Sequence, residues 1–213
     1  MRTIDCAQGT PEWHAARCGK VTASRIADVM AQTKSGWGAG RADYMAELVA
    51  ERLTGTAAEG FTNAAMKHGT ETEPQARAAY SFFAGADVQE IGFVLHPTLD
   101  ASGCSPDGLV GTDGMVEIKC PNTATHLETL LGGAIPDKYI KQMQWQMMCC
   151  ERAWCDFASF DPRLPTRMQL IVQRVPRDES MIASIEKHVA DFLAEVAAKE
   201  KALTAKFGEA LAA

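Results

Sequence analysis

The stretch SPDGLVGTDGMVEIKC, residues 105–120, constrains the fold of this chain more than any other segment. Its two apolar runs are separated by a Thr-Asp-Gly turn, so the stretch predicts a β-hairpin. Alternate side chains of a strand point to the same face, which places Glu117 and Lys119 together and their apolar neighbours on the other face. Two charges on one face of a mostly apolar strand need either a charged partner or a functional role.

Asp107 adds a third charge to this hairpin. It lies ten residues before Glu117, just ahead of the first strand, so the hairpin returns its carboxylate to the same end of the sheet. Two neighbouring carboxylates repel each other unless a dication lies between them. Mg²⁺ prefers a few carboxylates, with waters and phosphate oxygens completing its octahedron. The spacing therefore predicts a divalent metal site.

Lys119 has a role beside such a metal. Its ammonium group can hold or help to deprotonate an attacking water, or stabilise the charge that builds on phosphorus in a transition state. An isolated Glu-x-Lys pair also occurs on the solvated faces of many strands. Preceded by Pro-Asp at the distance of a hairpin, it has the PD-(D/E)xK nuclease signature.

The length and composition favour one folded unit. With 213 residues and 46% hydrophobic side chains, the chain can bury a core. We expect one domain over residues 1–213 with a helical N-terminal part (1–85), a metal-binding sheet core (86–177) and a C-terminal helix (178–213). No apolar run approaches a membrane span, and seven scattered cysteines fit reduced thiols. These features predict a soluble cytoplasmic protein with an α/β fold, in which a mixed β-sheet is flanked by α-helices.

The charge is distributed unevenly along the chain. The net charge is −6, whereas proteins that bind nucleic acid usually have a basic signature. Residues 42–130 carry −9, and the segments 1–41 and 131–177 each carry +3. Acidic residues thus concentrate around the candidate site. Two net-basic segments are available to flank it, although balances this small also describe ordinary solvated faces.

Local patterns predict several further elements. The segment 11–19 begins with proline and ends with glycine, as a short helix does, and Thr22 or Ser24 can cap the next helix. The glycine-rich segment 33–40 predicts a mobile loop, and no GK[ST] follows that would make it a P-loop. Among the tryptophans, Trp13 and Trp145 lie on apolar helical faces and are expected in the core, whereas Trp37 is expected to be exposed.

Five blocks of sequence together resemble the lambda phage exonuclease family, also called YqaJ-type viral recombinases, over nearly the whole chain. In order, these are PEWHAARCGKVTAS, HGTETEPQAR, the pair CSPDGLV and VEIKCP, YIKQMQWQM, and SFDPR. The resemblance implies a restriction-endonuclease-like α/β core. It also implies a Mg²⁺-dependent nuclease with two ions per active site, and it leaves open whether Mn²⁺ serves as well.

The resemblance assigns roles to individual residues of this chain. Asp107, Glu117, the Ile118 carbonyl and Glu73 would bind metal, with Glu73 acting through a second ion or its water. Lys119 would be the catalytic lysine. HGTETEPQAR also offers Glu71, so the choice of Glu73 rests on the alignment to the family.

Other matched positions concern the substrate. Gln142 matches a family glutamine near the active centre, and its alternative is a polar position on an amphipathic helix. Arg17, Ser24 and Ser105 match a pocket for a terminal 5′-phosphate, a role that suits a bidentate guanidinium and hydroxyl donors. Lys34 falls where the family has a basic residue that contacts duplex DNA.

The implied activity is 5′→3′ digestion of one strand of linear double-stranded DNA, preferably 5′-phosphorylated, to 5′-mononucleotides. The product would be a 3′ single strand for recombination by a single-strand annealing protein. The resemblance further implies a homotrimeric ring and a phage or prophage source. Two alternatives remain: a structure-specific or restriction-type endonuclease on the same core, and a non-catalytic DNA-binding module.

Overall fold

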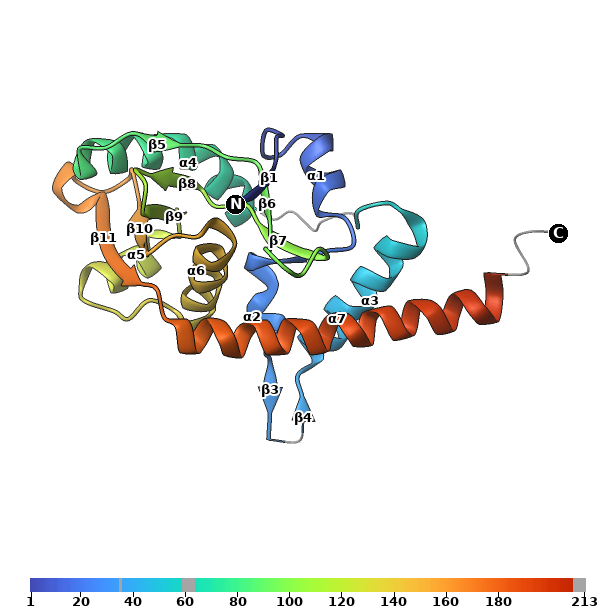
Figure 1. The fold of residues 1–213 in the computed structure, drawn as a ribbon. Helices are drawn as coiled ribbons and strands as arrows, with labels where there is room; N and C mark the ends of the chain where they lie inside the picture. The colour runs from blue at the N-terminus through green and yellow to red at the C-terminus, as the bar shows by residue number, and fades with distance from the viewer. Residues whose placement is uncertain (35, 59–63, 209–213) are drawn as a thin grey trace.

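The structure, a computed structural model, describes residues 1–34, 36–58 and 64–208 (Figure 1). Its helices fall where the helical patterns of the sequence lie, and two 3-10 turns, η1 and η2, accompany them. The helices are α1 (Pro11–Arg17), α2 (Ile26–Val29), α3 (Ala39–Thr54), α4 (Ala64–Ala84), α5 (Thr123–Leu130), α6 (Asp137–Cys150) and α7 (Glu179–Phe207), and the turns are η1 (Ala23–Arg25) and η2 (Thr166–Met168).

A mixed five-stranded sheet forms the centre of the fold, in the order β11-β10-β9-β8-β5. Strands β9 and β10 are parallel, and the other neighbours are antiparallel. The strands are β5 (Val88–Gln89), β8 (Gly108–Val110), β9 (Gly114–Lys119), β10 (Trp154–Phe160) and β11 (Leu170–Pro176). The prediction of an α/β fold with a mixed sheet flanked by helices is therefore confirmed.

A second sheet joins segments that are far apart in the sequence. Its order is β1-β6-β7-β2, with β1 (Arg2–Ile4), β2 (Val21–Thr22), β6 (Phe93–Leu95) and β7 (Ser102–Cys104). The sequence predicted a helical N-terminal part, but the structure also has strands there. Strands of two or three residues show too little alternation to be recognised by pattern.

The glycine-rich segment also differs from its prediction. Instead of a mobile loop it forms a two-stranded hairpin of β3 (Gln32–Thr33) and β4 (Gly36–Trp37), which projects from the body below α7 in Figure 1. The register pairs Gln32 with Trp37, and the Thr33 hydroxyl donates a hydrogen bond to the Gly36 carbonyl at 3.0 Å. Ser35 lies outside the described residues.

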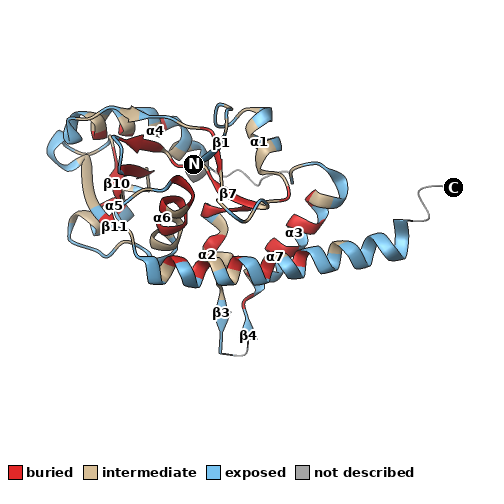
Figure 2. Ribbon diagram, viewed as in Figure 1, coloured by how far each residue is buried: buried red, intermediate tan, exposed pale blue. Residues whose placement is uncertain are grey.

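The central strands β8, β9 and β10 of the five-stranded sheet are mostly buried, whereas β11 and β5 at its edges are more exposed (Figure 2). Met115 and Phe157 point to the side that α6 covers, in a core shared with α2, α3 and α7. Val116, Ile118 and their neighbours point to the other side, against α4. This alternation along β9 places Glu117 on the side of Met115, toward α6.

Helix α7 confirms the prediction of a long C-terminal helix. It spans 29 residues, is capped by the Asp178 carboxylate, and packs against α3, α6 and α2 with buried residues as far along as Val196. Its C-terminal end extends beyond the body in Figure 1. Residues 209–213 of the predicted helix, like the predicted start of α4 at Asn63, lie outside the described residues. Across the described part of the chain, no helix is both long and apolar enough to cross a membrane.

Replacing Gly103 by alanine is expected to destabilise the fold by about 2 to 3 kcal/mol. Gly103 lies in β7, where a Cβ atom would meet the Val94 carbonyl oxygen at 2.4 Å and the Phe93 ring at 2.6 Å. The matched control is Gly69→Ala in α4, because nothing lies within 4 Å of a Cβ there and alanine favours a helix by about 0.5 to 1 kcal/mol. Urea unfolding of both variants tests this, and an equal stability for them would contradict it.

Candidate active site

Glu117 lies at the centre of the site, and its carboxylate is fully buried. Gln142 Nε2 donates a hydrogen bond to Oε1 at 2.7 Å, and Gln146 Nε2 donates one to Oε2 at 2.7 Å. Lys119 Nζ also forms an ion pair with Oε1. Both glutamines come from α6, one turn apart, because Glu117 faces that helix. The burial excludes the alternative that this Glu-x-Lys pair lies on a solvated strand face.

Asp107 lies at the start of the hairpin, where the sequence predicted it. The register pairs Gly108 with Val116, so Asp107 is carried alongside Glu117. Its Oδ2 accepts a hydrogen bond from the Ile118 N–H at 2.6 Å, which fixes the carboxylate at the end of β9. Burial and the neighbouring Glu117 charge raise the pKa of Asp107 well above its usual range.

Lys119 lies between these carboxylates and the aromatic ring of Tyr139. Its Nζ is 5.1 Å from the centre of that ring. Burial alone would lower the pKa of this lysine, but the Glu117 and Asp107 carboxylates outweigh burial and raise it. Lys119 is therefore a cation at neutral pH, held by two acidic groups.

Glu73 reaches the site from α4, on the other side of the sheet. Arg77, one turn further along α4, donates from Nη2 to Glu73 Oε1 at 2.6 Å and from Nε to the Asp107 carbonyl at 3.3 Å. Burial raises the pKa of Glu73, and the Arg77 charge opposes that rise. Arg77 thus links the helix that carries Glu73 to the loop that carries Asp107. Glu71, the alternative in the same motif, is exposed and forms an ion pair with Lys67.

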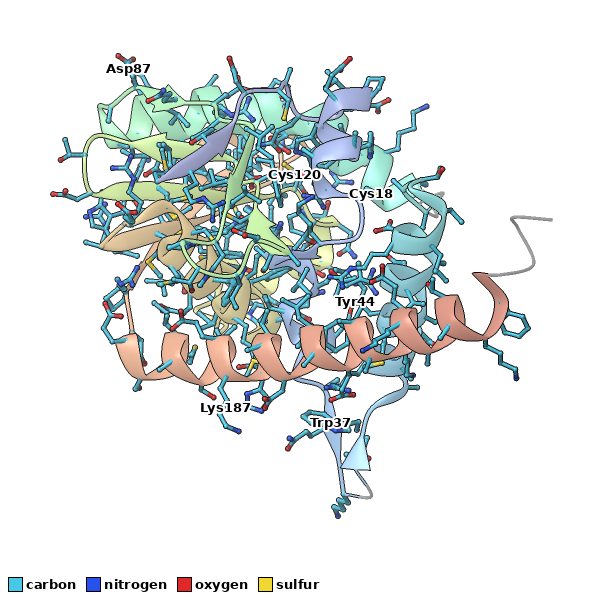
Figure 3. All side chains as sticks on the ribbon, turned by 45° about the vertical axis from the view of Figure 1, so that its right-hand side comes forward. Cys18, Trp37, Tyr44, Asp87, Cys120 and Lys187 are labelled. Atoms are coloured by element: carbon cyan, nitrogen blue, oxygen red, sulfur yellow. The ribbon has the colours of Figure 1, made fainter. Side chains whose placement is uncertain are left out.

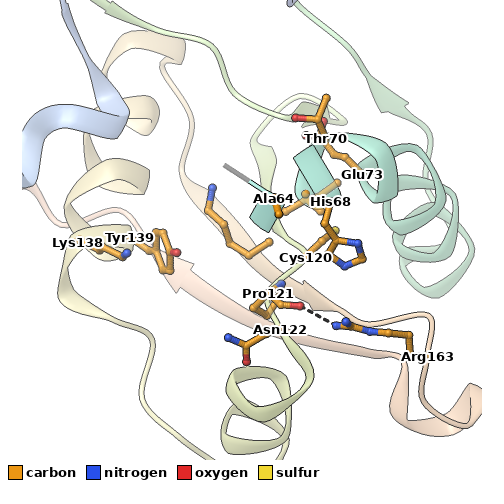
Figure 4. A pocket seen from close by; sticks show the side chains of 13 residues that line it. Ala64, His68, Thr70, Glu73, Cys120, Pro121, Asn122, Lys138, Tyr139 and Arg163 are labelled. Carbon is orange, nitrogen blue, oxygen red and sulfur yellow. Dashed lines mark hydrogen bonds between the residues drawn. The ribbon is translucent and has the colours of Figure 1, made fainter. Parts of the chain in front are cut away.

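An open cavity of about 790 Å³ lies at the site (Figure 4). Glu73, Ile118 and Lys119 line it, whereas Asp107 and Glu117 do not contribute to its lining. Lys138 and Tyr139 lie on one side of it in Figure 4, and Arg163 lies on the other. The remaining lining residues are Ala64, His68, Gly69, Thr70, Cys120, Pro121 and Asn122.

The donor set fits a hard divalent cation. Carboxylate and carbonyl oxygens are the ligands that Mg²⁺ prefers. Burial, and after it the neighbouring Glu117 charge, raises the pKa of Asp107, and a divalent cation bound there would favour the ionised carboxylate. In the described part of the chain, no three His, Cys, Asp or Glu side chains are close enough to form a metal site together. A divalent cation here would therefore have to be held by fewer than three of these side chains at once, with the Ile118 carbonyl and waters completing its coordination.

Two of the three residues predicted for a phosphate pocket lie together. Arg17 Nη1 is 3.4 Å from the Ser105 hydroxyl, to which it donates, and Trp13 Nε1 donates to the same hydroxyl at 2.8 Å. The Arg17 guanidinium lies 4.0 Å from the centre of the Trp13 ring. Ser105 is only two residues before Asp107, so this cluster adjoins the carboxylates along the chain.

Trp13 and Ser24 differ from their predictions. Trp13 is half-buried beside Arg17 and is not a core residue, unlike the fully buried Trp145. Ser24 lies inside η1 and is exposed, and Thr22 at the N-cap makes no side-chain capping bond. The Ser24 hydroxyl is 3.5 Å from that of Thr22, and no described contact joins it to Arg17. A capping role for Ser24 is therefore wrong.

Lys34 lies at the tip of the β3–β4 hairpin, exposed and away from the body. The base of the hairpin is fixed by Trp37, whose ring lies 4.1 Å from the Arg41 guanidinium and 6.1 Å from the His188 ring. Arg41 is itself held by two hydrogen bonds to Glu195 of α7. Trp37 is 48% exposed, as predicted, and Figure 3 shows it where the hairpin leaves the body.

Sequence reasoning missed three residues that contact predicted site residues. Gln146, Arg77 and Trp13 each lie four residues from a predicted site residue on the same helix. Helical neighbours at this spacing share one face. A search of positions i±4 around each candidate would therefore have found them.

Two solved structures resemble this chain over almost its whole length. An alkaline exonuclease from Laribacter hongkongensis (LHK-Exo), also solved in complex with dAMP, is 54% identical and superimposes with a TM-score of 0.87. The match covers 94% of this chain and 99% of that one. A phage-related exonuclease from Haemophilus somnus 129PT shares the fold at 16% identity, with a TM-score of 0.63 over 84% of this chain and 96% of that one. The match at 54% identity places this chain in the class of phage-type exonucleases.

The family follows from the sequence match. A model of the YqaJ-like viral recombinase domain matches residues 12–153, which is more than half of the chain. The chain therefore belongs to the YqaJ-like viral recombinase family. No curated protein matches it.

Proposed function

We propose that this protein is a Mg²⁺-dependent 5′→3′ exonuclease that digests one strand of linear duplex DNA to 5′-mononucleotides. The observation that supports this most is that the fully buried Glu117 lies with the partly buried Asp107 and Lys119 beside an open cavity. Two carboxylates held this close cost stability, and such pairs are concentrated at functional sites.

Asp107, Glu117, the Ile118 carbonyl and Glu73 would hold the metal. A bound Mg²⁺ would offset the negative charge of the scissile phosphate and lower the pKa of a coordinated water. Gln142 and Gln146 fix the Glu117 carboxylate by one hydrogen bond to each oxygen. Arg77 fixes Glu73 relative to the loop of Asp107. Pre-organised ligands of this kind avoid the cost of ordering them during the reaction.

Lys119 acts as a fixed positive charge beside the reacting phosphate. Because its pKa is raised, its ammonium group is protonated when the substrate arrives. It can then donate a hydrogen bond to the attacking water or to a phosphate oxygen, on which negative charge builds in the transition state. Tyr139 and the carboxylates limit where Nζ can move.

Arg17 and Ser105 form the candidate pocket for the terminal 5′-phosphate. A guanidinium and a hydroxyl that already share a hydrogen bond are two donors aimed at one place, which suits a phosphate dianion. Trp13 orders this pair by stacking on Arg17 and by donating to Ser105. The family further suggests a homotrimeric ring and an annealing partner for the 3′ strand, and Lys34 on its hairpin as a contact to duplex DNA ahead of the site.

The test is digestion of linear duplex DNA with 5′-phosphate or 5′-hydroxyl ends, beside closed circular DNA, with Mg²⁺ or with EDTA. We expect acid-soluble mononucleotides from linear DNA alone, faster with the 5′-phosphate, and none in EDTA. Arg17→Ala should remove most of the preference for the phosphate, about tenfold, because one charge-assisted hydrogen bond contributes about that much. Strand polarity follows from labelling one end at a time.

Each other outcome selects an alternative. Cleavage of closed circles would indicate an endonuclease, and binding of DNA without any metal-dependent cleavage would indicate a non-catalytic module. Repeating the digestion with Mn²⁺ in place of Mg²⁺ tests which ion the protein uses, independently of which reaction it catalyses, because the donor set accepts both ions.

A further inference from the structure

Arg163 lines the same cavity as Lys119 and Glu73 but comes from a different part of the chain (Figure 4). It is the last residue of the SFDPR segment (159–163), which begins in β10 and continues past its end. In Figure 4 its side chain reaches across to Pro121 at the border of the cavity. Its position on the cavity wall raises the question of what this guanidinium contacts.

A buried aspartate holds Arg163 in place. Asp161 is fully buried, and it accepts hydrogen bonds from Arg163 N at 3.0 Å, Nε at 2.7 Å and Nη2 at 3.0 Å. Thr123 donates to the same carboxylate at 2.7 Å, and Arg163 Nη2 also donates to the Pro121 carbonyl at 3.2 Å. One edge of the guanidinium is therefore fixed to the protein, so its other edge has a defined direction.

That other edge is available to a ligand. The side chain of Arg163 is 49% exposed. Within the described ranges of the chain, its hydrogen bonds are made by Nε and Nη2 and none by Nη1. A guanidinium presents five N–H donors in a planar fork, which matches phosphate oxygens. A cation held this way beside a cavity that also contains Lys119 and Lys138 favours an anionic ligand.

Arg174 shows what a purely structural pair of the same kind looks like. Its Nε and Nη2 donate to the Asp156 carboxylate of β10 at 2.8 and 2.9 Å, and its side chain is 57% exposed. However, its guanidinium is covered by the Trp154 ring at 3.6 Å, and it does not line the cavity. Arg163 shares the pairing with a buried aspartate but has no such cover.

We propose that Arg163 binds a backbone phosphate of the DNA strand in the active-site cavity, separate from the terminal 5′-phosphate at Arg17. This inference rests on the proposed function, because it requires DNA in that cavity. Arg163 would hold the strand through a charge-assisted hydrogen bond from Nη1, and Asp161 would act as a positioning residue by fixing the opposite edge. The contact carries no sequence information, as suits digestion of any DNA.

The experiment measures DNA binding without cleavage. A fluorescent, 5′-phosphorylated duplex is titrated with the full-length protein in EDTA, from about 50 to about 250 mM KCl. We expect Arg163→Ala to weaken binding about fivefold at the lowest salt and to make the slope of log affinity against log salt shallower by about one. Arg163→Lys keeps the charge and should recover part of the affinity.

Arg174→Ala is the matched control, and it should bind DNA as the wild type does. The proposal is overturned if Arg163→Ala keeps the wild-type affinity and salt slope, or if Arg174→Ala loses as much as Arg163→Ala. Thermal melts verify that each variant is folded. If the alanine variant unfolds, Arg163→Lys is compared with the wild type in its place. Wild-type digestion of linear DNA is measured in parallel. Normal digestion with no effect at Arg163 rejects only this inference, whereas no digestion at all rejects the proposed function.

Discussion

Replacing Lys119 by alanine will slow digestion of linear duplex DNA by about a hundredfold to a thousandfold, while DNA binding in EDTA changes little. The reason is that Lys119 supplies a fixed positive charge where negative charge develops, and such groups contribute about 3 to 4 kcal/mol to the transition state. In the bound ground state that contact is one among many. The loss should therefore appear in kcat and not in affinity.

Single-turnover digestion at saturating Mg²⁺ measures this effect. Lys187→Ala is the control, because Lys187 is an exposed lysine on the far side of the body, labelled in Figure 3. Removing Lys119 also leaves the buried Glu117 without its countercharge, so the melting temperature should fall, and the assay must be run well below it. A rate within tenfold of the wild type would show that Lys119 takes no part in the reaction.

The hairpin of the candidate site could be predicted because its signals are local. A turn between two apolar runs fixes which residues face each other, and the period of two places Glu117 and Lys119 on one face. The observed turn lies at residues 111–113, with Gly111 at φ +55°, one residue earlier than the predicted Thr112-Asp113-Gly114, and β9 begins at Gly114. The pairing of Asp107 with Glu117 tolerates that difference because the register is set by the strands.

Contacts between distant segments could not be predicted in the same way. Nothing in the sequence around Trp13 shows that its indole will meet Ser105, because that contact depends on how α1 lies against β6. The same holds for His126, which has no evident partner in the sequence but is buried against the Ser159 hydroxyl and the Met168 carbonyl. Periodicity identifies which face is buried, whereas tertiary packing decides what that face touches.

Asp107→Asn is expected to stabilise the protein in EDTA while lowering digestion by about a thousandfold or more. The folded-state pKa of Asp107 is raised, so its ionised form costs stability at any pH above the ordinary carboxyl pKa. Asparagine removes that charge and keeps an oxygen that can accept the Ile118 N–H. Removing this penalty should raise the free energy of unfolding, and with it the Tm, in EDTA.

Thermal unfolding with and without Mg²⁺, at several pH values, tests both halves of this prediction. In EDTA the variant should melt above the wild type at pH 8. The difference should shrink as the pH falls through the raised folded-state pKa of Asp107, and it should be gone below the ordinary carboxyl pKa of the unfolded chain. Adding Mg²⁺ should raise the melting temperature of the wild type and not that of the variant, because a ligand stabilises only the state that binds it. Asp87→Asn, at an exposed aspartate labelled in Figure 3, should do neither. A variant less stable than the wild type in EDTA would mean that the two carboxylates do not repel, and that Asp107 is held there by its hydrogen bond and not in readiness for a metal.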